Sequence, residues 1–218
     1  MKGFISNLIE SSPINKMPYF KFLNDGTMSK KFFIESQIDV LEAVRFFSKP
    51  MFIIASKLET YEQRQTILKN IIDEHGNGNL DEAHGKTFEK FLFSFGVTRE
   101  TIINSKSSNV VMSFNKSLLL CATNETTMRS IAMMGIIEER YSTMSANLVN
   151  AILERGWINK SQLNHYSLHE NLDVEHAQGF YDLISDGWRS PISKKEIKKG
   201  LIMGNSLIGN LYNGLLKE

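Results

Sequence analysis

The segment HYSLHENLDVEH, residues 165–176, carries the side chains most suited to chemistry in this sequence. On an α-helix, which turns about 100° per residue, His169, Asp173 and His176 fall within roughly 60° of one another. The same face of that helix carries the apolar or aromatic residues Tyr166, Leu172, Phe180, Leu183 and Ile184. We therefore expect the two imidazoles and the carboxylate to point into the protein, where each must be hydrogen-bonded, paired or bound to a metal ion.

A second candidate is Glu138, within residues 130–153. Helical periodicity places it at the centre of an apolar face formed by Ile131, Met134, Tyr141, Val149 and Ile152. Its neighbour Glu139 is turned to the edge of that face, and Arg140 is expected to face away. Small residues on the face of Glu138 either leave space for ions or a ligand, or let helices approach closely: Gly135, Ser142 and Ser145.

Two further candidates lie around the turn DEHGNGN, residues 73–79. Glu74 continues the apolar face of the preceding helix, although a carboxylate at a helix end is commonly solvated. His84 shares a helical face with Phe88, Phe91 and Phe95, where a lone histidine is often structural. Asp81 and Glu82 are alternatives to Glu74, and His75 is expected to lie outside the site.

These candidates come from four helical regions and combine three carboxylates with three imidazoles. Mixed oxygen and nitrogen ligands suit iron or manganese, with zinc as an alternative, and six ligands are enough for two ions. The sequence contains neither a cysteine cluster nor a phosphate-binding glycine loop nor a serine hydrolase motif. Iron–sulfur, nucleotide-dependent and serine hydrolase chemistry are therefore not indicated.

The elements that must position these residues are all helical. Apolar residues recur at helical spacing, and four prolines interrupt 218 residues, so we predict an all-α fold. A long helix is expected from Ser29 into the 50s, bent near Pro50. Capping boxes are predicted at Asn159 with Gln162 for the helix of the opening segment, and at Ser193 with Glu196 for the last helix.

Composition limits the function classes. A formal net charge of +1 gives no field that would attract nucleic acid or an anionic membrane. The apolar runs are shorter than the roughly 20 residues that cross a bilayer. The chain start lacks a signal-peptide pattern, and Cys121 is the one cysteine in the sequence, so a cytoplasmic protein is expected. Residues 1–218 are expected to form one domain.

Taken together, these residues resemble the haem-oxygenase-like diiron oxidase superfamily. Its pattern places a Glu and a His around a glycine-containing turn, a Glu on a later helix, and then H-x3-D-x2-H. The matching residues here are Glu74, His84, Glu138, His169, Asp173 and His176. The chain looks most like the CADD-like branch and more distantly like the TenA and PqqC groups. The resemblance implies a bundle of about seven to eight helices in which these six residues bind two iron ions, with manganese or zinc as alternatives.

The resemblance also implies an activity, namely oxidation of a small organic carboxylate, amine or aromatic substrate with dioxygen as co-substrate. Tyr141, one turn after Glu138, is the candidate for redox participation, although it is equally consistent with a core tyrosine. Two alternatives remain: a metal-stabilised protein-interaction module without enzymatic activity, and a cofactorless oxidase of the PqqC kind. A haem oxygenase is disfavoured because the first histidine is His75. A homodimer is expected by analogy with the family.

Overall fold

The computed structural model describes residues 1–217 and the side chains of these residues except positions 164 and 167–174. This part of the chain is all-α, as predicted, and contains eleven α-helices where about seven to eight were expected. The helices are α1 (Lys2–Ser11), α2 (Pro18–Asn24), α3 (Lys30–Phe46), α4 (Ser48–Ser56), α5 (Tyr61–Glu74), α6 (His84–Ser94), α7 (Arg99–Asn104), α8 (Asn109–Asn124), α9 (Thr127–Glu154), α10 (Asn164–Ile184) and α11 (Pro191–Gly214).

The predicted long helix near Pro50 is two helices. Helix α3 ends at Phe46 and α4 begins at Ser48, so that Pro50 lies in the first turn of α4. In the first turn a backbone N–H has no partner within the helix, and proline therefore costs no intrahelical hydrogen bond there. The break between α3 and α4 is one reason why the helix count exceeds the expectation.

One of the two predicted capping boxes is present in the structure, and the other is not. The box of Asn159 and Gln162 is present, but it closes a short 3-10 helix, Lys160–Gln162, that precedes α10. The box of Ser193 and Glu196 is wrong, because α11 begins two residues earlier at Pro191. Glu196 instead accepts a hydrogen bond from Arg129 Nε at 2.8 Å, which ties α11 to the start of α9.

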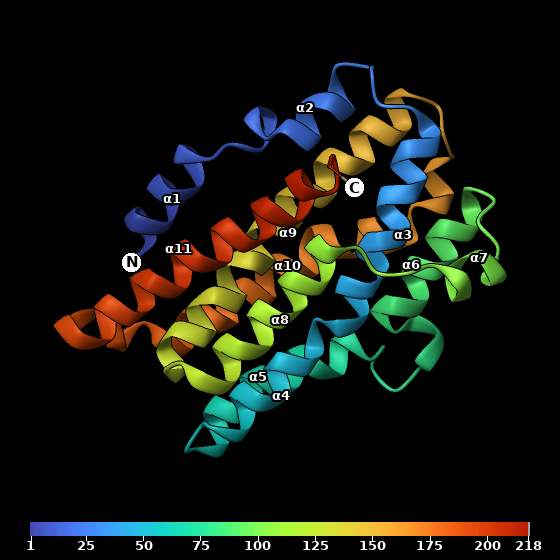
Figure 1. The fold of residues 1–218 in the computed structure, drawn as a ribbon. Helices are drawn as coiled ribbons and strands as arrows, with labels where there is room; N and C mark the ends of the chain where they lie inside the picture. The colour runs from blue at the N-terminus through green and yellow to red at the C-terminus, as the bar shows by residue number, and fades with distance from the viewer. Residues whose placement is uncertain (218) are drawn as a thin grey trace.

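Three long helices form the centre of the fold. Helix α9 packs against both α10 and α11, and the other helices surround this group (Figure 1). Helices α5 and α6 pack against α10, while α3 packs against α6 and α8. Helix α5 also packs against α4, and its last residue is Glu74. Within the described residues, no helix combines the length and apolarity that a membrane span requires.

Helices α9 and α11 approach closely at Gly204. A Cβ atom at this position would lie 2.5 Å from both the Met133 carbonyl oxygen and Ile136 Cγ2. Because backbone atoms cannot move aside without displacing the helix, overpacking at such a contact destabilises a protein. Gly209 in the same helix would place its Cβ 3.8 Å from the nearest atom, which is Met17 Cε. The two glycines are therefore a matched pair.

Replacing Gly204 with alanine is expected to lower the free energy of unfolding by about 2 kcal/mol. Gly209→Ala is expected to raise it by about 0.5 kcal/mol, since alanine loses less backbone entropy in a helix. Urea unfolding followed by circular dichroism measures both. Equal stabilities of the two variants would mean that the close approach of α9 and α11 is not as described.

Candidate metal centre

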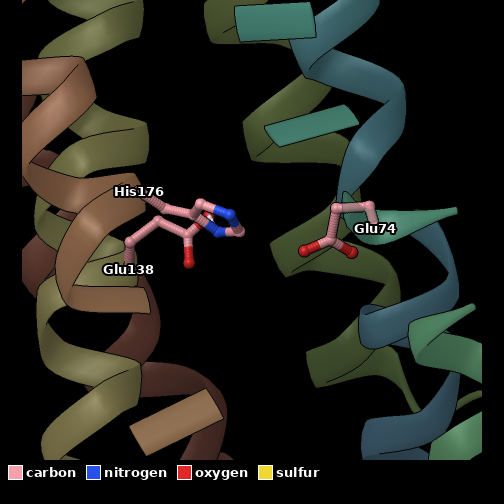
Figure 2. A group of neighbouring side chains, drawn as sticks. All are labelled: Glu74, Glu138 and His176. Carbon is pink, nitrogen blue, oxygen red and sulfur yellow. Dashed lines mark ion pairs between the residues drawn. The ribbon is translucent and has the colours of Figure 1, made fainter. Parts of the chain in front are cut away.

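A buried group of three side chains lies where α5, α9 and α10 meet. Glu74, Glu138 and His176 each offer one ligand atom, and these atoms all lie within 4.8 Å of one another. Figure 2 shows Glu138 and His176 projecting from neighbouring helices toward Glu74. The exposed fractions are 9% for Glu74 and 2% for Glu138 and His176. Two carboxylates and one imidazole thus converge in the protein interior.

A glycine turn brings the next helix beside Glu74, the last residue of α5. Gly76 has φ +80°, and a Cβ atom on it would lie 2.6 Å from Ala83 N. The turn therefore folds back tightly onto the start of α6, where the first residue is His84. His84 Nδ1 lies 2.8 Å from Glu74 Oε1, and both side chains are buried. The solvated helix end considered for Glu74 is not what the structure shows.

The alternative carboxylates and the other histidine near this turn are exposed to solvent. Asp81 and Glu82 are exposed, and Glu82 pairs with Lys90 at 3.3 Å. His75 is exposed as well, and its Nδ1 lies 2.7 Å from the Ile71 carbonyl oxygen. None of these three residues belongs to the group of ligand atoms that the structure brings together.

His176 has a different partner at each ring nitrogen. Its Nε2 lies 3.0 Å from Asp73 Oδ2, and its Nδ1 lies 3.8 Å from Glu138 Oε1. Burial works against ionisation of Asp73, but hydrogen bonds from His176 and Asn77 hold its pKa below the ordinary value. Asp73 was not predicted from the sequence, because one residue along a helix is a turn of about 100° away from the face of Glu74.

His169 and Asp173, the other two predicted ligands on α10, lie outside the described side chains. On the same helix, His165 is buried and its Nδ1 lies 2.8 Å from Thr87 Oγ1. The structure therefore places His165 against α6. Of the six predicted ligands, it brings Glu74, Glu138 and His176 together and adds His84 through its pairing with Glu74.

The neighbours of Glu138 on α9 have structural partners. Glu139 is half-buried and accepts a hydrogen bond from the Tyr181 hydroxyl at 2.6 Å. Burial, together with the charge of Glu139, raises the pKa of Tyr181. Arg140, expected to face away from the core, is buried and donates to the Ser12 carbonyl oxygen at 2.7 Å. That expectation was wrong because the N-terminal segment covers this side of α9.

A cavity of about 50 Å³ adjoins the buried group. Glu74, His84 and Glu138 form part of its wall, beside Tyr141 and Tyr212. The remaining lining is apolar, from Val40, Ala43, Val44, Phe47, Phe114, Ile137, Ile208 and Leu211. A cavity of this size exceeds the roughly 10–15 Å³ that one water molecule requires. Small ligands or water thus have room beside the carboxylates, in a mostly apolar environment.

Tyr141 is half-buried at the wall of this cavity, one turn after Glu138. It also interacts with Tyr166, whose pKa burial holds well above the ordinary value.

Gly135, which was considered as a space-making residue, instead allows close packing of α10. A Cβ at Gly135 would lie 2.9 Å from Tyr181 Cε1 and 3.0 Å from Phe180 Cβ.

The side chains present fit a divalent metal ion. Carboxylate oxygens and imidazole nitrogens are the ligands that iron and manganese take in helical bundles. The Nδ1 atom of His176 is buried and has no hydrogen-bond partner within the part of the chain that the structure describes. A buried polar atom without a partner costs free energy. A metal ion bound between this nitrogen and the two carboxylates would remove that cost.

Comparison with known proteins agrees with this geometry. Residues 38–196 match the model of a protein family described as "Iron-containing redox enzyme". The chain is 21% identical over 209 residues to a 4-aminobenzoate synthase of Chlamydia muridarum, covering 95% of this chain and 85% of that protein. It is 20% identical over 169 residues to a 4-chloro-allylglycine synthase of Streptantibioticus cattleyicolor, covering 76% of this chain and 64% of the other.

The fold also has a counterpart among solved structures. A domain of unknown function from Shewanella denitrificans, described as having a heme oxygenase-like fold, superposes with a TM-score of 0.82 at 12% identity. The superposition covers 99% of this chain and 90% of that domain. The haem-oxygenase-like fold inferred from the sequence is thereby confirmed.

Proposed function

We propose that this chain, which belongs to the family of iron-containing redox enzymes, activates dioxygen at two iron ions in order to oxidise a small organic substrate. The observation that carries the proposal is the buried group of Glu74, Glu138 and His176 beside a cavity with a mostly apolar wall. Iron, when bound, supplies the electrons that reduce dioxygen.

Each side chain has a separate task in this proposal. Glu74, Glu138 and His176 bind metal, and so does His84, which lies against Glu74. His169 and Asp173 complete the ligands by the family pattern. The apolar wall of the cavity excludes bulk water, which strengthens the interaction between the buried charges and the ions. Tyr141, which lines the cavity, is the residue proposed to give a proton or an electron to a molecule bound there.

Two observations support a substrate class: the residues that line the cavity, and the names of the relatives. The cavity wall is mainly apolar, so it suits a hydrocarbon or aromatic portion of a molecule. Two relatives are named 4-aminobenzoate synthase and 4-chloro-allylglycine synthase, after products that carry both an amino and a carboxyl group, and we propose that the substrate of this chain carries the same groups. We infer a small amino- and carboxyl-bearing substrate with an apolar portion, oxidised in a reaction that consumes dioxygen.

Anaerobic reconstitution with ferrous iron tests the proposal. The expected result is about two iron ions per chain, since the proposed ligands suffice for a two-ion site. Exposure to oxygen should then give oxygen uptake measured with an electrode, together with oxidation of the iron seen in the optical spectrum. Chain that binds no iron under any loading condition, or iron-loaded chain without oxygen uptake, would contradict the proposed function.

A further inference from the structure

We infer that Asp73 is a positioning residue, which fixes the proton of His176 on Nε2 and so directs the unprotonated Nδ1 toward the metal-binding group. The inference rests on the proposed function, because it gives Nδ1 the task of binding metal. Its basis is the different environment of the two ring nitrogens. Nε2 lies 3.0 Å from Asp73 Oδ2, whereas Nδ1 lies 3.8 Å from Glu138 Oε1.

The proton position follows from the chemistry of the partners. A neutral imidazole carries one N–H and one nitrogen with a free lone pair. An ionised carboxylate only accepts hydrogen bonds, so a neutral His176 must keep its proton on Nε2 in order to donate to Asp73. The lone pair is then on Nδ1, and an unprotonated nitrogen is what metal binding requires. Nδ1 is also one of the buried atoms for which the described residues provide no hydrogen-bond partner.

Asp73 itself lies outside the group of ligand atoms. Its side chain is 11% exposed, and it contacts His176 on the ring nitrogen that does not face Glu138. Asp73 directly precedes Glu74 on α5. The end of this helix therefore provides two carboxylates: Glu74 belongs to the metal-binding group, and Asp73 orients His176. Asn77, in the glycine turn that follows, hydrogen-bonds to Asp73 and holds it from the other side.

This arrangement has a general physical role. Histidines that bind metal commonly donate their second ring N–H to a carboxylate, which fixes the tautomer and the ring orientation. Losing such a carboxylate typically weakens metal binding by about 10- to 100-fold. An asparagine in its place can turn its amide to donate to Nε2, which favours the tautomer with the proton on Nδ1. Asp73→Asn should therefore place a proton on His176 Nδ1 and so prevent this nitrogen from binding metal. The asparagine side chain has nearly the same size as aspartate, so the substitution leaves no cavity.

The first test uses the metal-free wild-type protein. Nitrogen-15 NMR of histidine-labelled protein reports which ring nitrogen carries the proton, and the chain has only five histidines to resolve. The signals of His176 are identified as those absent from His176→Gln. A proton on Nε2 is expected. A proton on Nδ1 in the neutral ring would overturn the inference, whatever the metal-binding properties of the protein.

The second test measures the affinity for Co²⁺, a spectroscopic substitute for Fe²⁺, from its visible absorption. Asp73→Asn is expected to weaken binding about 10- to 100-fold and to change the cobalt spectrum. The matched control is Glu175→Gln, which removes one charge beside His176 from an exposed side chain that pairs with Lys69 at 3.7 Å. This control is expected to bind Co²⁺ within about twofold of wild type, because exposed charges are strongly screened.

A double variant shows whether Asp73 acts by positioning His176 or only through its negative charge. In a His176→Ala background, Asp73→Asn should cause no further loss of Co²⁺ affinity, because its effect acts through that ring. Equal losses in both backgrounds, or wild-type affinity in Asp73→Asn, would overturn the inference. Absence of Co²⁺ and Fe²⁺ binding by the wild-type protein would instead refute the proposed function, while the NMR measurement would still test Asp73.

Discussion

Replacing Glu138 with glutamine is expected to weaken binding of the first ferrous ion by at least about 100-fold, which corresponds to about 3 kcal/mol. Glu138 is 2% exposed and lies within 4.8 Å of the ligand atoms of Glu74 and His176. The amide keeps the shape of the side chain but removes the negative charge that faces the ion, and in a buried site this charge is weakly screened.

Glu139→Gln is the matched control, because it makes the same chemical change one residue further along α9. Glu139 is half-buried and accepts a hydrogen bond from Tyr181 at 2.6 Å, outside the group of ligand atoms. Its replacement is expected to leave the affinity for iron within about threefold, or about 0.7 kcal/mol. Anaerobic titration with a competing chelator measures both variants. Normal binding by Glu138→Gln together with impaired binding by Glu139→Gln would reverse the assignment on this helix.

Metal binding is expected to stabilise the fold strongly. A ligand that binds only the folded state adds about 4 kcal/mol to the free energy of unfolding when its concentration is 1,000 times Kd. Removal of the ion by a chelator should therefore lower the stability of the loaded protein by that amount. The ion would link three helices, because α5, α9 and α10 all contribute side chains to the group. Urea unfolding with and without ferrous or manganous ion measures the difference in the free energy of unfolding.

The Glu138→Gln variant provides the internal check on this stabilisation. If its affinity is 100-fold lower, the same metal concentration is only ten times its Kd, and the expected stabilisation is about 1.4 kcal/mol. Metal-free wild type and metal-free variant must be compared first, because the substitution changes a buried residue. An equal metal-dependent gain in both proteins would mean that the stabilising ion binds elsewhere.

Asp73 gives the end of α5 a second function beside Glu74. The turn that reverses the chain after α5 places His84 against Glu74 and Asn77 against Asp73. One compact segment thus fixes the orientation of a carboxylate in the group and of the histidine opposite to it. The geometry of the group then depends on how α5 packs against α10, rather than on the ligand residues alone.

The helical class and the inward direction of Glu138 could be predicted from the amino-acid sequence, because both depend on local periodicity. Apolar residues at helical spacing define a buried face whatever packs against it, and Glu138 lies at the centre of such a face. The same reasoning indicated that His84 lies on the core side of its helix, and the structure shows it buried. The family was also recognisable from the spacing of His169, Asp173 and His176, although the roles of these residues remain predictions.

The choice between Glu74 and its neighbours, and the contact of Asp73 with His176, depend on how distant segments of the chain pack. The tight turn at Gly76 turns Glu74 inward against His84 and leaves Asp81 and Glu82 exposed. Arg140 was misjudged for the same reason, since periodicity cannot show that the N-terminal segment covers its side of α9. A sequence pattern records which face of each helix is apolar, whereas contacts between helices depend on how distant segments pack. Those contacts determine which carboxylate meets which imidazole.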